Sequence, residues 1–334
     1  MKSTKGLKLV ALATLIAFAS GLQTGVGQEP TRNLEATERP VVPANLGQPG
    51  AAAAEESGEA AGAAASDAGA QRPVKVKKSG VSTFFGYNTK YFYRSNPTMS
   101  GTELKNQRTG MWTNTFYAGA GLGVVETDSS VITPYVGASW TINDYIEGGL
   151  DTLNYNSTGA YALLLAQFGN GWSARAGINY AADSSTENDT EDYREYFPNI
   201  GVLKAYNISD SVVGIFDAGT GKHITKADSL LLPITDELDN WEIFASYGFN
   251  WQMSENLRVS PKYRASYKTY DNGNNSNRDD FTSMASLRIA YSLSKSVTID
   301  LSTAYTNRSA SGGISDFDFK NLDAGGGLSL NARF

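Results

Sequence analysis

The chain of 334 residues has no cysteine and a single histidine, His223. Without cysteine it has no disulfide framework, no thiolate zinc site, no thiol nucleophile and no lipid-modified cysteine at a mature N-terminus. One imidazole also excludes every metal site that needs two histidine ligands. Most metal and nucleophile chemistry is therefore absent, and the sequence predicts no catalytic residue, no cofactor, no metal site and no enzyme.

Charge and long apolar runs are also scarce. Charged residues make up 19% of the chain, below the roughly 25% of soluble domains. A transmembrane helix needs about 20 apolar residues, but the longest apolar run after the N-terminus is the short stretch 161–166. Helical membrane proteins are thereby excluded. A pI near 5.0 also argues against a nucleic-acid-binding protein, for which a basic stripe and a pI above about 9 are expected.

Residues 1–27 have the features of a secretory signal peptide. Three lysines precede an apolar core at residues 9–19, which is too short to span a bilayer. Small residues follow, and they predict cleavage near residue 19 or residue 27. Because charge, apolar core and small residues occur in this order, export is favoured over a buried N-terminal helix.

Residues 28–78 form a segment rich in alanine, glycine, proline and glutamate, with almost no aromatic or branched side chains to bury. This composition predicts a disordered periplasmic tail rather than a domain. A flexible chain of this length has a root-mean-square reach of about 40 Å. We expect a plain spacer; a tether across the periplasm or a contact with the cell wall is the alternative.

From residue 79 to residue 334, apolar and polar side chains alternate with a period of two. This pattern predicts β-strands with one apolar and one polar face, because successive side chains of a strand point to opposite sides. Mean hydropathy stays at -0.31, since the two faces average out. The segments that show the pattern number thirteen: 81–94, 112–125, 131–142, 145–156, 159–168, 171–181, 193–206, 211–219, 240–252, 257–270, 281–293, 295–307 and 322–334.

Aromatic residues indicate what the apolar face contacts. Trp241 and Trp251 lie on one face, ten residues apart. In a tilted strand this spacing corresponds to about 25 Å along a barrel axis, the height of the apolar band of a membrane barrel. Trp172 and Tyr180 are spaced similarly. These four residues are the predicted aromatic girdle, and they favour a transmembrane antiparallel up-and-down β-barrel over a soluble sandwich.

The C-terminal segment alternates apolar and polar residues and ends on Phe334, with Leu328 and Leu330 on its apolar face. It resembles the terminal strand by which bacterial outer-membrane barrels are recognised for assembly, although Ala332 replaces the usual bulky residue. The resemblance implies the outer membrane of a Gram-negative bacterium. It also implies the barrel assembly machinery, outer-membrane lipid and lipopolysaccharide as partners.

Connections between the segments alternate in length over the C-terminal half. Short ones lie at 169–171, 253–256 and 292–295, and long polar ones at 183–192, 219–239, 271–280 and 308–320. Periplasmic turns and extracellular loops alternate in this way. Thirteen strands cannot return both ends of the chain to the periplasm. A strand hidden in residues 222–232 gives fourteen, and a spurious segment in the N-terminal half gives twelve.

Four short motifs in the last fifth of the chain are similar to those of putative β-barrel porins of the porin 2 type: NRDD at 277–280, AYSLS at 290–294, AYTNRS at 304–309 and SDFDFKN at 315–321. The resemblance implies an outer-membrane barrel, a pore, and in some members a link to export of surface polysaccharide. It supplies no catalytic residues.

The candidate functional residues lie on the polar faces, which predict a water-filled lumen. A cationic wall attracts anions in a narrow channel, whereas cations paired with lumenal acids only rigidify it; both interpretations remain open. His223 is expected in a solvated loop, and the acidic loop 183–192 is expected to be plain solvated charge. The predicted pore-lining residues are Arg258, Lys262, Arg264, Lys268, Arg288, Glu242 and Asp300.

The predicted function is passive diffusion of small hydrophilic solutes through a barrel of 12 to 14 strands, with a mild anion preference. The alternative is an accessory barrel for surface-polysaccharide export or envelope structure. The sequence does not distinguish a monomer from a trimer.

Overall fold

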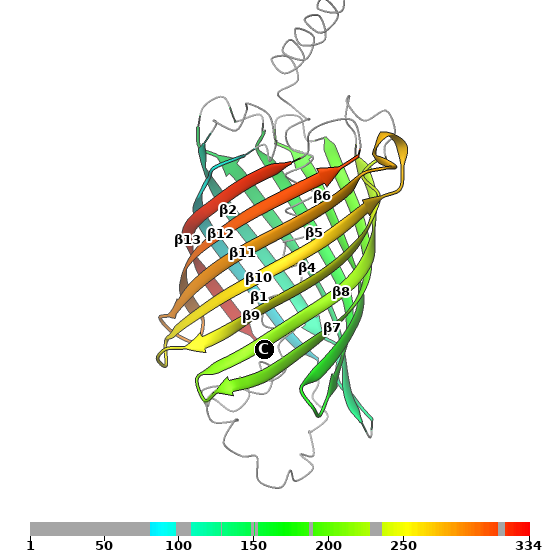
Figure 1. The fold of residues 1–334 in the computed structure, drawn as a ribbon. Coiled ribbons are helices and arrows are strands. Elements are labelled where there is room, and N and C mark those ends of the chain that lie inside the picture. Colours follow the sequence, from blue (N-terminus) through cyan, green and yellow to red (C-terminus); the bar gives the residue numbers. More distant parts are fainter. Residues whose placement is uncertain are drawn as a thin grey trace, which may run out of the picture.

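The computed structural model describes residues 81–97, 108–127, 129–147, 150, 153–186, 190–227, 236–312 and 318–334. In these residues one antiparallel sheet closes on itself to form a barrel (Figure 1). Each long strand pairs with its neighbours in the chain, and β1 pairs with β13 to close the sheet. The twelve long strands are β1 (Ser82–Arg94), β2 (Thr109–Gly121), β4 (Ser130–Tyr145), β5 (Tyr155–Phe168), β6 (Trp172–Ser185), β7 (Glu191–Ser209), β8 (Val212–Ala227), β9 (Asn240–Gln252), β10 (Leu257–Tyr270), β11 (Asp279–Ser292), β12 (Val297–Ser311) and β13 (Phe319–Arg333).

Two minor elements complete the described part of the chain. The short strand β3 (Val125–Glu126) pairs only with β4, while β2 pairs with β4 directly. One turn of 3-10 helix, η4 (Gly273–Asn275), lies between β10 and β11. No helix among the described residues is long and apolar enough to cross a membrane.

The structure resolves the strand number to twelve. Segment 145–156, predicted as a strand, is wrong: Tyr145 ends β4, Tyr155 begins β5, and the described residues between them form no strand. Of the two alternatives, the one with a spurious segment in the N-terminal half therefore holds. The alternative of a separate strand in residues 222–232 does not, because 222–227 continue β8, which runs without a break from Val212 to Ala227. Small residues at 217–221 (DAGTG) weaken the alternation there, so one strand of 16 residues was predicted as a short strand followed by a loop.

Both ends of the described chain lie at one end of the barrel. The backbone N–H of Thr83 donates to the carbonyl of Phe334 at 3.0 Å, and that of Phe334 donates to the carbonyl of Thr83 at 2.9 Å. The short turns after β5, β7, β9 and β11 lie at this inner end, at the bottom of Figure 1. The strand ends that the other connections join lie at the opposite, outer end. The predicted alternation of short and long connections therefore holds in part. The predicted solvated loop 183–192 is wrong at its ends, because 183–185 belong to β6, where Asp183 is buried, and 191–192 belong to β7.

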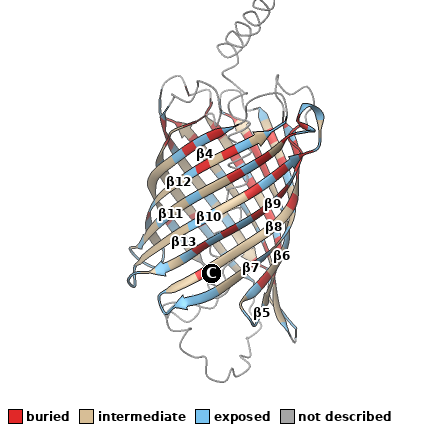
Figure 2. Cartoon of the chain, viewed as in Figure 1, coloured by how far each residue is buried: buried red, intermediate tan, exposed pale blue. Residues whose placement is uncertain are grey.

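The outer surface of the barrel carries the apolar side chains. In β9, Trp241, Ile243 and Tyr247 are exposed, whereas Glu242 and Phe244 between them are buried. Large apolar residues are exposed in the same alternating way on every long strand, which is the outer band of an outer-membrane-type barrel. Water-exposed patches of this extent are avoided by soluble monomers, so this surface faces lipid. Figure 2 shows the alternation along the strands, with buried residues gathered toward the outer end.

Candidate functional site

The lumen has one neutral wall and one charged wall. The described inward-facing residues of β2, β4 and β5 carry no charged side chain; they are hydroxyl, amide, small, aromatic and aliphatic residues. Tyr135, Tyr161, Leu163 and Leu165 pack together on this side. All charged side chains that point into the lumen from the described strands come from β6 to β13 and from β1. The surface of the lumen is therefore asymmetric in charge.

His223 lies at the centre of a buried charged cluster in the outer half of the charged wall. Its Nε2 is 3.0 Å from Oε2 of Glu242 on β9, and its Nδ1 is 3.1 Å from Oε1 of Glu195 on β7. The Phe197 ring stacks on the imidazole with 3.9 Å between ring centroids. The expectation of a solvated loop histidine is wrong, because β8 continues past Gly219 and carries His223 inside the barrel.

The cluster continues through β10. Arg264 donates from Nη2 to Oε1 of Glu242 at 2.8 Å, and its guanidinium lies over the Phe244 ring at 4.2 Å from the centroid. Lys268 is buried four residues further out on the same strand, opposite Glu242 in the register of β9 and β10. One carboxylate thus contacts both a histidine and an arginine, and this is the paired arrangement that buried charges require.

A second centre of pairing lies around Asp280 on β11. Its carboxylate accepts from Arg278 Nε at 2.8 Å and from the Tyr270 hydroxyl at 3.1 Å, and Arg308 Nη1 lies 3.7 Å away. Lys268 is opposite Asp280 in the register of β10 and β11, so the two centres adjoin. Four strands, β9 to β12, are joined by charged side chains at this height.

Two connections pack over the outer ends of the same strands. Asp239 accepts from the backbone N–H of Thr225 at 2.6 Å and from its hydroxyl at 2.8 Å. Glu237 accepts from the backbone N–H of Asn274 at 3.2 Å. Leu238 packs on Tyr193, Ala227 and Tyr270. Segments 236–239 and 272–278 therefore cover the outer end of the charged wall.

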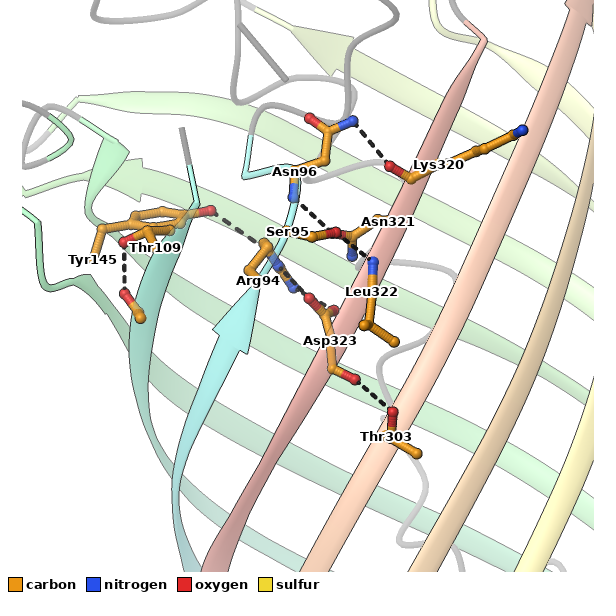
Figure 3. A network of polar contacts seen from close by, with 11 residues as sticks. Arg94, Ser95, Asn96, Thr109, Tyr145, Thr303, Lys320, Asn321, Leu322 and Asp323 are labelled. Atoms are coloured by element: carbon orange, nitrogen blue, oxygen red, sulfur yellow. Dashed lines mark hydrogen bonds and ion pairs between the residues drawn. The ribbon is translucent and has the colours of Figure 1, made fainter. Parts of the chain in front are cut away.

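The seam between β1 and β13 has its own polar network (Figure 3). Arg94 donates to both carboxylate oxygens of Asp323, from Nε at 3.1 Å and from Nη2 at 3.2 Å, and reaches the Tyr145 hydroxyl at 3.5 Å. The backbone N–H of Asn96 donates to Oδ1 of Asn321 at 3.0 Å. A bidentate arginine fixes register as well as charge, so this pair stabilises the closure of the barrel.

The part of the charged wall around Asp300 is arranged differently. Lys90 Nζ and Arg288 Nε lie 3.8 Å and 3.5 Å from the same carboxylate oxygen, Oδ1 of Asp300. Arg258 donates from Nε to Oε1 of Gln252 at 3.2 Å. Lys262 points into the lumen from the same strand, where it is exposed. Cations here have more contact with water than those of the outer half.

Several long side chains lie along the lumen wall, over glycines of the neighbouring strand. A Cβ added to Gly137 would lie 2.5 Å from Cε1 of Tyr161, and one added to Gly119 would lie 2.3 Å from Cζ of Phe84. Atoms at such distances overlap, so each ring occupies the space that the glycine leaves free. The rings therefore follow the wall instead of projecting across the lumen.

The predicted residues lie on the faces that the alternation assigns to them. Arg258, Lys262, Arg264, Lys268, Arg288, Glu242 and Asp300 lie on the lumenal face of β9 to β12. Trp241, Trp251 and Trp172 are exposed on the outer surface, and Tyr180 lies on the outer face of β6. Leu328, Leu330 and Phe334 lie on the outer face at the inner end, where Phe334 stacks on Phe85 with 5.9 Å between centroids. Their roles in transport, anchoring and assembly stay predictions.

Sequence reasoning missed several partners of these residues. Glu195, His223 and Asp280 complete the outer cluster, and Lys90 completes the group around Asp300. The only signal for them was their position on polar faces. Their pairing depends on which strands are neighbours and on the register between them. The alternation of polar and apolar residues gives no information on either.

The chain is similar to several solved barrels, at low sequence identity. No family model and no curated protein matches the chain, so the resemblance to the porin 2 type stays a prediction. An outer membrane channel from Pseudomonas putida F1 is 9% identical and matches over 79% of this chain and 100% of its own, with a TM-score of 0.48.

Two further solved structures are similarly distant. The NanC porin is 12% identical over 73% of this chain and 98% of its own, with a TM-score of 0.42. The translocator domain of the autotransporter NalP from Neisseria meningitidis is 12% identical over 77% of this chain and 90% of its own, with a TM-score of 0.40. Function therefore has to be argued from the side chains of this chain itself.

Proposed function

We propose that this protein is an outer-membrane channel for the passive diffusion of small hydrophilic solutes. One observation carries the proposal: a closed barrel with an apolar outer surface has a lumen lined by polar side chains, and its long side chains lie along the wall. Barrels of 8 strands are filled by their side chains, and the interior widens with strand number. Twelve strands leave room for an aqueous path.

The charge distribution supports a mild preference for anions. In the outer half, the carboxylates of Glu195, Glu242 and Asp280 are each paired with cations or with histidine. Around Asp300, on the lumenal faces of β10 to β13 and β1, the described cations are Lys90, Arg258, Lys262 and Arg288, and the described carboxylate is Asp300. Excess positive charge in a narrow low-dielectric channel raises the local concentration of anions.

Catalysis is not part of the proposal. Barrel hydrolases that use one histidine place it beside a hydroxyl nucleophile. The nitrogens of His223 instead face two carboxylates, and an aromatic ring covers its plane. This arrangement supports a structural role for His223.

The membrane environment and the assembly route belong to the same proposal. The exposed apolar band supports contact with outer-membrane lipid and lipopolysaccharide. Phe334 at the end of β13 supports recognition by the barrel assembly machinery. The motifs at 277–280 and 290–294 flank β11, which agrees with the proposed relationship to porin 2 type barrels.

The test is electrical. The purified protein is inserted into planar lipid bilayers, and current is recorded in a gradient of KCl. We expect stepwise conductance and a reversal potential displaced in the direction set by chloride. Absence of any channel would remove the porin function, and a reversal potential set by potassium would remove the anion preference alone.

A second function, an accessory barrel for polysaccharide export or envelope structure, is favoured by one observation. Segments 236–239 and 272–278 pack over the outer end of the charged wall, and a more complete closure of this kind would leave a poorly conducting barrel. This function predicts low conductance together with an envelope defect on deletion of residues 28–78. High conductance with no effect of the deletion would exclude it.

A further inference from the structure

We propose that Lys90 and Arg288 form a binding station for oxyanions beside Asp300 on the lumen wall, and that phosphate is the simplest ligand. The inference rests on the proposed channel, because a solute reaches the station through the lumen. It goes beyond a general anion preference, since it places a saturable site at two named side chains.

The two cations share one carboxylate. Lys90 Nζ lies 3.8 Å from Oδ1 of Asp300, and Arg288 Nε lies 3.5 Å from the same atom. Neither distance is that of a good hydrogen bond, and Oδ1 accepts no hydrogen bond from the described residues. Two positive charges and one negative charge leave an excess of one positive charge at the station.

Exposure separates this station from the other ion pairs of the lumen. The side chains of Lys90 and Arg288 are 36% and 44% exposed, whereas Asp300 between them is 0% exposed. Arg264 is 17% exposed and is 2.8 Å from its carboxylate, and Arg175 is 20% exposed and is 2.6 Å from Asp217. Those arginines direct their donors at a protein partner. Lys90 and Arg288 retain donors that face water, and within the described part of the chain Asp300 is their common ion-pair partner.

Four adjacent strands build the station. Lys90 of β1 is opposite Gly327 of β13, and Gly327 is in turn opposite Asp300 of β12. A Cβ on Gly327 would lie 2.6 Å from Cγ of Lys90, so the lysine stem crosses the sheet over this glycine. Arg288 approaches from β11, where the neighbouring lumenal residue Ala290 is opposite Asp300. The two cations therefore reach one carboxylate from opposite sides.

This geometry suits a group with several oxygen atoms. A phosphate presents oxygens to both cations at once, with charge-assisted hydrogen bonds to an arginine and a lysine. Chloride has one centre and cannot offer a separate oxygen atom to each cation. Asp300 fixes the two side chains and also weakens binding by repulsion, and a channel needs a ligand to leave as well as to enter.

Phosphate titration of the channel current tests the station. The full chain is refolded, inserted into planar bilayers in KCl at neutral pH, and the current is recorded as phosphate is added. We expect a saturable, reversible decrease of the current. Arg288→Gln removes one of two cations within about 4 Å of the ligand. We therefore expect it to raise the phosphate concentration that blocks half of the current by roughly tenfold. Arg288→Lys keeps the charge and is expected to stay within about threefold of the original protein.

Two further variants give the controls. Asp300→Asn removes the repulsion and is expected to lower the half-blocking concentration. Lys204→Gln removes a lysine of β7 that contacts the Trp172 ring on the outer face, and it is expected to leave the block unchanged. A current that phosphate does not affect, or an equal block in Arg288→Gln and the original protein, overturns the station while the channel stands. Absence of any current overturns the proposed channel, and the station with it.

Discussion

Replacing Glu242 by glutamine tests whether the outer charged cluster stabilises the barrel. The substitution keeps the shape of the side chain and removes one charge that is in contact with His223 at 3.0 Å and with Arg264 at 2.8 Å. Glu242 itself is buried. Removing one partner of a buried ion pair costs roughly 3–5 kcal/mol, because the remaining charge stays out of water.

The expected cost lies at the low end of that range. Glu195 stays 3.1 Å from the other nitrogen of His223, and Arg264 is 17% exposed, so water compensates part of its charge. We therefore expect Glu242→Gln to lower the free energy of unfolding by about 3 kcal/mol. The same chemical change at Asp217→Asn is the matched control. Asp217 and Arg175 are each 20% exposed, so we expect a loss of at most about 1 kcal/mol.

The assay is equilibrium unfolding of the refolded barrel in lipid vesicles by guanidinium chloride, followed by tryptophan fluorescence. The midpoint is expected to fall for Glu242→Gln with an unchanged slope, which reports a loss of stability rather than a change in the unfolded state. Equal losses in the two variants, or a loss below about 1 kcal/mol for Glu242→Gln, would refute the reasoning. Burial would then not decide which ion pairs hold the barrel together.

Two other predictions concern the width of the lumen and assembly. Gly137→Val places a side chain where the Tyr161 ring lies, with a Cβ 2.5 Å from Cε1, so the ring is expected to move into the lumen and lower single-channel conductance. The control is Gly169→Ala, at a turn with no atom within 4 Å of the added Cβ. Equal conductance of the two variants would contradict this geometry. Phe334→Ser removes a side chain that is 76% exposed, so we expect little change in the stability of the refolded barrel but a clear loss of protein from the outer membrane, measured by membrane fractionation; normal membrane yield would exclude Phe334 as an assembly signal.

Alternation along the sequence predicted most of the barrel because each strand has two solvents, lipid on one face and water on the other. In β9 this contrast runs from Trp241 to Trp251 on one side and from Asn240 to Asn250 on the other, with Phe244 as the one large apolar residue on the lumenal side. The alternation is weaker at the small residues 217–221, and for this reason the prediction divided β8 into a short strand and a loop. It also failed at 145–156, where the ends of β4 and β5 together resemble one more alternating segment.

Side-chain partners could not be predicted in the same way. Glu195 and Glu242 are 47 positions apart in the numbering, and they meet at His223 only because β7, β8 and β9 are neighbours with a fixed register. A shift of the register by one residue would turn every one of these side chains to the other face. The sequence therefore located charged side chains in the lumen without showing which of them neutralise one another.

The cations of β10, which the sequence predicted as one group of pore-lining residues, differ in burial and therefore in their expected roles. A charge without water must be paired, so Arg264 and Lys268, which adjoin Glu242 and Asp280 in the outer half, are expected to act on stability. An excess of charge persists only where water reaches it. In this barrel water reaches Lys262 on β10 and the cations Lys90 and Arg288 beside Asp300. Selectivity and stability are thus expected to respond to different residues of one strand: Lys262→Gln should change the reversal potential, and Arg264→Gln should change the unfolding midpoint.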